Sequence, residues 1–175
     1  MSYDLYFYQP LESKHSQSDI FQYLSENLTP KDKQFDQWFF ENERTGVYFM
    51  FEFAEPVFPP GDDPDDTEHP VFDGYSFSGF FFNLNFGRPD FFGHEAFIFV
   101  EKLISDLSLS VFDPQSDSET DTLTRPTGTE MCESWIDSNS RATGVIREQD
   151  PNAFVYFPPE ITNAAWNYNF HADRL

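Results

Sequence analysis

The chain has little positive charge and almost no cysteine. It contains 10 Lys and Arg residues against 31 Asp and Glu, so its formal net charge is −21 over 175 residues. A surface this negative repels the phosphates of nucleic acids and of anionic membranes, which argues against direct binding to DNA, RNA or lipid. The single cysteine, Cys132, excludes an intramolecular disulfide and favours a reducing compartment.

Long apolar runs and catalytic motifs are also missing. No segment approaches the roughly 18 apolar residues of a membrane span, and the N-terminus lacks the basic and apolar regions of a signal peptide. We therefore expect a cytoplasmic protein. There is no glycine-rich phosphate loop and no Gly-x-Ser-x-Gly sequence, and the four histidines form no metal-binding pair. These absences predict a protein that is not an enzyme and uses no cofactor or metal.

What the chain has in abundance is aromatic side chains: 23 Phe, 8 Tyr and 3 Trp. Acidic chains that stay disordered are poor in such residues, because they cannot bury enough apolar surface to offset the entropy lost on ordering. The composition thus predicts a folded core, and the length fits one domain over residues 1–175.

Hydrophobic periodicity places the secondary structure. Alternating or aromatic runs predict strands at residues 3–8, 35–41, 47–53, 75–86, 109–112 and 153–157. Residues three and four apart predict helices behind Ser16, with Asp19 completing a capping box, behind Asp90, and over residues 130–146. The tail, residues 158–175, contains a possible further helix from residue 161. This order predicts an α+β fold: an antiparallel sheet of about five strands with two to three helices packed on one face.

The longest predicted strand, residues 75–86, changes its pattern at Gly79. Aromatic residues occupy odd positions before this glycine, at Tyr75 and Phe77, and even positions after it, at Phe80 and Phe82. A switch of this kind at a glycine is typical of a β-bulge.

Two acidic loops are expected, at about residues 55–70 and 113–128. The first contains five clustered acidic residues, which are Asp62, Asp63, Asp65, Asp66 and Glu68. It could be a solvated loop, a surface for a basic partner, or a metal site. Pro64 interrupts the run and Gly61 precedes it, unlike a calcium loop. The second loop, with Asp113, Asp117, Glu119 and Asp121, lacks the later bidentate Glu, so we expect metal in neither.

Two other groups are candidate sites. Asn83 and Asn85 alternate with Leu84 and Phe86, so if helices cover the Phe face these two asparagines face solvent or a partner. Cys132 could act as a nucleophile only if a histidine such as His94 lay near it in space. Neighbouring Glu130 and Glu133 disfavour its thiolate, so we expect an inert thiol.

Two stretches, Tyr3-Asp4-Leu5-Tyr6-Phe7-Tyr8 and residues 83–96 (Asn-Leu-Asn-Phe-Gly-Arg-Pro-Asp-Phe-Phe-Gly-His-Glu-Ala), carry a resemblance. In these stretches, in size and in charge, the chain resembles the small acidic immunity proteins of bacterial polymorphic toxin systems. The resemblance implies a cytoplasmic protein that neutralises a toxin by occluding it, with no catalytic residues.

The charge supports the same function, because a negative protein associates rapidly with a basic cleft. The expected partner-binding residues are the five acidic residues of the first loop together with Asn83 and Asn85. The free protein is expected to be a monomer, since copies repel one another. The alternatives are a carboxylate- or metal-dependent enzyme and an interaction module of a larger assembly.

Overall fold

A six-stranded antiparallel sheet forms the centre of the protein in the computed structural model, which describes residues 1–32, 37–53, 70–116 and 121–172. The strands are β1 (Ser2–Pro10), β2 (Thr29–Asp32), β3 (Gln37–Glu41), β4 (Tyr48–Phe53), β5 (Tyr75–Asn85) and β6 (Ser110–Phe112). Their spatial order is β2-β3-β4-β5-β1-β6, and every neighbouring pair is antiparallel. The helices are α1 (Gln17–Asn27), α2 (Phe91–Leu107), α3 (Gly128–Gln149) and α4 (Pro159–Phe170).

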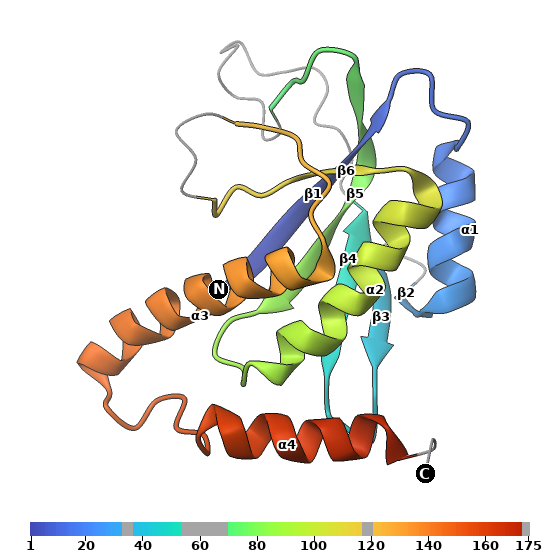
Figure 1. Ribbon diagram of the computed structural model, residues 1–175. Coiled ribbons are helices and arrows are strands. Elements are labelled where there is room, and N and C mark those ends of the chain that lie inside the picture. Colours follow the sequence, from blue (N-terminus) through green and yellow to red (C-terminus); the bar gives the residue numbers. More distant parts are fainter. Residues whose placement is uncertain (33–36, 54–69, 117–120, 173–175) are drawn as a thin grey trace.

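Helices α1, α2 and α3 lie on one face of the sheet, and α4 runs across its lower end in Figure 1. The core lies between that face and the helices. Its sheet side is built from alternate residues of the three central strands, among them Leu5, Phe51 and Phe82, all essentially inaccessible to solvent. The helix side comes mainly from α2, with Phe97, Val100 and Leu103 buried. The predicted α+β class, with an antiparallel sheet and helices on one face, is confirmed.

The strand that sequence patterns missed is β2. The pair Thr29-Pro30 was read only as a helix stop, and it does end α1, whose C-cap is Leu28. The chain then continues straight into a short strand that pairs with β3 at the edge of the sheet. An edge strand tolerates proline because one side of its backbone needs no partner.

Two helices begin with the capping boxes that their sequences encode. Ser16 accepts a hydrogen bond from the Asp19 amide, and the Asp19 carboxylate accepts from the Ser16 amide in return. Thr127 and Glu130 form the same reciprocal pair, so α3 begins at Gly128, two residues before the predicted start. Asp90 occupies the N-cap position of α2, but its side chain makes no capping hydrogen bond.

The irregularity at Gly79 is present, but it does not switch the faces of β5. Tyr6 pairs with Phe81 and Tyr8 with Phe77, leaving one residue between the pairs on β1 and three on β5. Gly79 takes a positive φ of 85° within this insertion. The insertion adds two residues to β5, an even number, so the side chains before and after it keep the same alternation between the two faces of the sheet. Phe77 and Phe81 therefore lie on one face, and both contact the ring of Tyr6, at centroid distances of 6.3 and 5.6 Å.

The predicted strand at residues 153–157 is wrong. This segment is irregular, and Phe154 within it takes a positive φ of 53°. Arg147 holds it by donating to the carbonyls of Ala153 and Phe154, and the Tyr156 hydroxyl donates to the carbonyl of Gly87. The aromatic residues of this segment predict a strand, but the Arg147 side chain satisfies two of its carbonyls in place of a strand partner.

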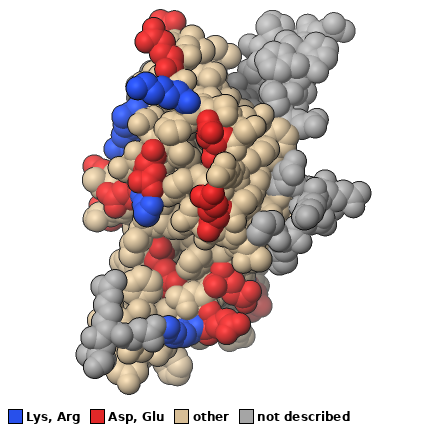
Figure 2. Space-filling model, turned by 90° about the vertical axis from the view of Figure 1, so that its right-hand side faces the viewer, with Lys and Arg blue, Asp and Glu red and all other residues tan. Residues whose placement is uncertain are grey.

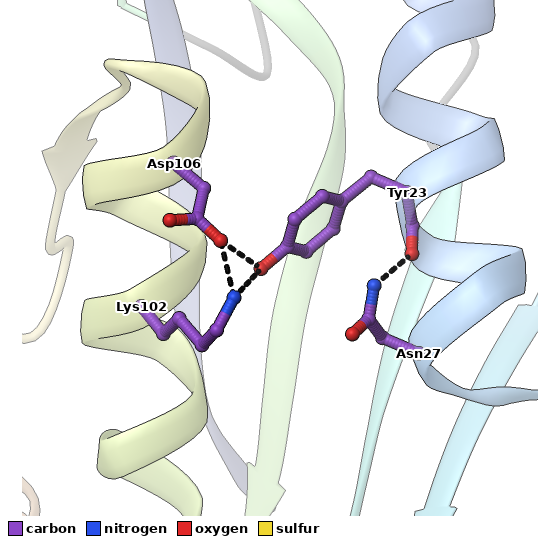
Figure 3. Close-up of polar contacts among 4 residues, drawn as sticks. All are labelled: Tyr23, Asn27, Lys102 and Asp106. Atoms are coloured by element: carbon purple, nitrogen blue, oxygen red, sulfur yellow. Dashed lines mark hydrogen bonds and ion pairs between the residues drawn. The ribbon is translucent and has the colours of Figure 1, made fainter.

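A polar cluster braces α1 against α2 (Figure 3). The hydroxyl of Tyr23 donates to Asp106 at 2.8 Å, while the Lys102 ammonium contacts both that hydroxyl and the Asp106 carboxylate. The cluster joins two helices that both cover the sheet. Within the described residues, no helix combines the length and the apolar character needed to cross a bilayer.

Candidate partner-binding face

The side chains on the face of the sheet opposite α1, α2 and α3 form what we call the outer sheet face. In β1, β4 and β5 the accessible ones include Asp4, Tyr6, Met50, Glu52, Phe81, Asn83 and Asn85. They alternate with the buried core residues and oppose one another across the strands: Asp4 pairs with Asn83, and Met50 pairs with Asn83 from the other side. All are partly or largely accessible to solvent.

Asn83 and Asn85 were predicted from the sequence as candidate contact residues. Both lie on the face away from α1, α2 and α3, as their alternation with Leu84 and Phe86 predicts. Asn85 is exposed. Asn83 is half-buried and donates from its amide nitrogen to a carboxylate oxygen of Asp4 at 2.6 Å. The two asparagines line a shallow hollow of about 90 Å³ together with Phe39 and Met50.

Asp4 is the acidic residue at the centre of this face. It accepts hydrogen bonds from Asn83 and from the hydroxyl of Ser2, at 2.6 and 3.2 Å. Partial burial raises the pKa of its carboxyl group, and these two hydrogen bonds oppose the rise because they favour the charged form. The N-terminal ammonium also favours the charged form through space. A half-buried carboxylate whose described hydrogen-bond donors are neutral can accept a further hydrogen bond from a cation supplied from outside.

Aromatic rings adjoin the polar residues. The ring of Tyr6 lies 5.6 Å from that of Phe81 and 6.3 Å from that of Phe112 on the edge strand β6. Tyr8 and Phe72 make an edge-to-face contact at 4.9 Å beside them, and the Tyr8 hydroxyl donates to the Pro70 carbonyl. The face therefore combines a flat aromatic area with carboxylates, which suits a protein interface.

Several of the few cations make their described contacts with neutral groups of the fold. Arg125 donates to the carbonyl of Ser108, and Arg147 to two carbonyls after α3. The Arg88 guanidinium lies 5.0 Å from the centre of the Tyr48 ring. Figure 2 shows the side of the molecule that carries α1, where acidic side chains outnumber basic ones and are spread over the surface.

The five acidic residues expected to bind a partner, Asp62, Asp63, Asp65, Asp66 and Glu68, lie outside the described residues. Their place relative to the outer sheet face is therefore not part of this structure. The prediction that they contact a partner stays a prediction.

The structure places His94 beside Cys132. The sequence analysis required such a neighbouring histidine if Cys132 were to act as a nucleophile. The sulfur lies 3.4 Å from Nδ1 of His94 in a hollow between α2 and α3. Burial raises the pKa of the thiol to about 12, with further contributions from the carboxylates of Asp90 and Glu133. The sulfur is therefore protonated at neutral pH, and the pair does not supply a thiolate.

A second cluster was not found from the sequence. The hydroxyl of Tyr3 contacts the Asp113 carboxylate and lies 3.0 Å from Ser134, which donates to the same carboxylate at 3.1 Å. Burial is the main reason that the pKa of Tyr3 is strongly raised. No signal could have revealed this cluster, because its three residues are far apart in the sequence. It links β1 to α3 and keeps the Tyr3 hydroxyl protonated.

No three histidine, cysteine, aspartate or glutamate side chains within the described ranges are arranged so that they could hold a metal ion. The fold and this face define the chain as an α+β protein with an antiparallel sheet whose second face presents carboxylates, amides and aromatic rings. No family model matches the chain, and no curated protein or solved structure matches it either.

Proposed function

We propose that this protein is an immunity-type inhibitor that neutralises a toxin with a basic cleft by occluding it, and that the outer sheet face takes part in the contact. It acts by binding, without catalysis. The observation that carries the proposal is Asp4: a half-buried carboxylate with neutral hydrogen-bond donors, on a strand face away from α1, α2 and α3, in a chain of net charge −21.

The physical argument has two parts. Long-range attraction between the negative protein and a basic cleft raises the association rate, because the field steers the encounter. Once the two surfaces meet, the aromatic rings beside Tyr6 and Phe81 can be buried at the interface centre, where large apolar side chains contribute most of the binding energy. Many toxins that cut nucleic acids have basic clefts for phosphate, which makes them suitable partners.

We expect a secreted toxin to be encoded beside this gene, and the test uses that toxin. Its toxin domain is co-expressed with the full chain in bacterial cells, and binding of the purified proteins is followed at two salt concentrations. We expect protection of the cells and an association rate that falls steeply as salt rises. A toxin domain that neither binds nor loses its toxicity contradicts the proposal.

A matched pair of variants tests the surface itself. Asn85→Lys adds one positive charge on the outer sheet face, at an exposed position, and should slow association by about two- to fivefold at low salt. Gln22→Lys adds the same charge on α1, where Gln22 already contacts Glu26, and should have a smaller effect. If the two substitutions slowed association equally, the outer sheet face would not be part of the interface.

A further inference from the structure

Helix α4 is turned so that its apolar stripe faces solvent. Ile161, Ala164, Ala165 and Tyr168 recur at steps of three, one and three, which places them on one side of a helix. All four are exposed, with Ile161 and Tyr168 retaining 55% and 67% of their accessible surface. No residue of α4 is buried. We call these four residues the α4 stripe.

The opposite side of α4, which faces the protein, carries two half-buried aromatic residues, Trp166 and Phe170, whose ring centroids lie 5.1 Å apart in a stacked pair. It also carries Thr162 and Asn169, both half-buried, and Asn163, whose side-chain oxygen is buried without a hydrogen-bond partner. The main attachment is Trp166, which donates from Nε1 to the buried carboxylate of Glu95 at 2.8 Å and lies against the ring of His94. Both sides of α4 therefore carry large apolar side chains, and those of the α4 stripe are the ones left exposed to solvent.

We propose that the α4 stripe is the interface of a weak homodimer, in which α4 of one copy packs antiparallel against α4 of a second. The size pattern of the stripe favours this occupant. It reads large, small, small, large, and is therefore symmetric about the point between Ala164 and Ala165. A two-fold interface requires such self-complementarity. Two antiparallel helices would meet closely at the alanines, with Ile161 of each copy beside Tyr168 of the other.

The distribution of charge supports the same occupant. Between residues 151 and 172 the chain has one acidic residue, Glu160, and no Lys or Arg. Repulsion between two copies of a chain with net charge −21 is therefore weakest where this segment faces itself. A basic toxin would find no charge complementarity on the stripe, in contrast to the outer sheet face.

The dimer must be weak, which agrees with a monomer at low concentration. Twelve residues of helix extend about 18 Å, so the contact is well below the roughly 800 Å² per partner of a stable interface. We expect a dissociation constant on the order of 10⁻⁵ to 10⁻⁴ M. The dimer should become tighter as the salt concentration rises, because salt screens the repulsion between the two negative copies and leaves the apolar contact in place.

The test is sedimentation equilibrium of the full chain over a range of protein concentrations, at about 0.1 M and about 1 M NaCl, where the Debye lengths are about 10 and 3 Å. We expect reversible dimerisation that becomes tighter at the higher salt. Ala164→Glu places a charge at the centre of the interface and should weaken the dimer at least tenfold. Asn167→Glu adds the same charge to the same helix, off the stripe, and should leave the dimer nearly unchanged. Circular dichroism checks that both variants fold.

Three results would overturn the proposal. The wild-type chain could stay monomeric well above the expected dissociation constant at both salt concentrations. A dimer could form but be equally stable in the Ala164→Glu variant, which would place the interface elsewhere. The wild-type chain could be monomeric while Ala164→Glu abolishes binding of the neighbouring toxin, which would assign the stripe to the toxin. Toxin binding that survives while dimerisation fails leaves the proposed function intact.

Discussion

The contact between α2 and α3 predicts that replacing glycine by alanine lowers the stability of the protein at one site and raises it at another. Gly93 lies in the first turn of α2, where a Cβ atom would come within 2.7 Å of Cε3 of Trp135 and 3.1 Å of Sγ of Cys132. Gly144 lies inside α3, where a Cβ atom would meet nothing within 4 Å. Both positions have helical backbone, so alanine is compatible with the conformation of each.

The expected magnitudes follow from two competing effects. Alanine stabilises a helix interior by about 1 kcal/mol relative to glycine, and less in the first turn, where fewer backbone hydrogen bonds depend on it. At Gly93 the added methyl group overlaps the ring of Trp135, which is fully buried and cannot move aside. Overpacking of this kind costs about 1–3 kcal/mol. We expect Gly144→Ala to stabilise the protein by about 0.5–1 kcal/mol and Gly93→Ala to destabilise it by about 1–2 kcal/mol.

Urea unfolding followed by tryptophan fluorescence and circular dichroism measures both changes, with equal m-values showing that the unfolded states are comparable. For a chain of this length, each kcal/mol corresponds to about 2–4 °C in Tm. The two variants should therefore lie on opposite sides of the wild type. A Gly93→Ala variant that is as stable as the wild type, or more stable, would show that α2 and α3 do not pack as closely as the structure has them.

Three further predictions concern charge. Changing Asp62, Asp63, Asp65 and Asp66 together to Asn should leave Tm unchanged or slightly raised and slow toxin association by about tenfold at low salt; an unchanged rate in stopped-flow binding removes this loop from the interface. Asp4→Asn should raise Tm at neutral pH, because burial raises the pKa of Asp4 in the folded state and so makes its ionised form unfavourable. Since the folded state then binds the proton more tightly than the unfolded state, the advantage of Asn should disappear as pH falls through the pKa of folded Asp4; a variant less stable than wild type at pH 7 contradicts this. EDTA should leave Tm unchanged, and a rise in Tm with millimolar calcium that EDTA reverses would reveal a metal site.

Local sequence rules account for most of the fold. The capping pairs at Ser16 and Thr127 determine where α1 and α3 begin, since both partners of each box lie within four residues of one another. Alternation located the three central strands and placed Asn83 and Asn85 on the face away from α1, α2 and α3. Two errors, at β2 and at residues 153–157, arose where a proline or an aromatic run was read locally although distant partners decided the conformation.

The candidate sites were less predictable. Alternation could assign Asn83 to a face, but the pairing that brings Asp4 beside it depends on how β1 and β5 align. The contact of Cys132 with His94, and the cluster of Tyr3, Asp113 and Ser134, come from packing between elements that are distant in the chain. Periodicity describes which side of an element a residue occupies and carries no information on what that side meets.

The sequence by itself determined the negative charge, the aromatic core and most of the helices and strands, because these follow from composition and from contacts between near neighbours. The neighbouring carboxylates already predicted an inert Cys132 thiol, but only the tertiary structure added the burial and the Asp90 carboxylate that raise its pKa further. It also decided which side of α4 is exposed. The sequence contains the apolar stripe of Ile161 and Tyr168, but Trp166 and Glu95 fix the helix with that stripe turned to solvent.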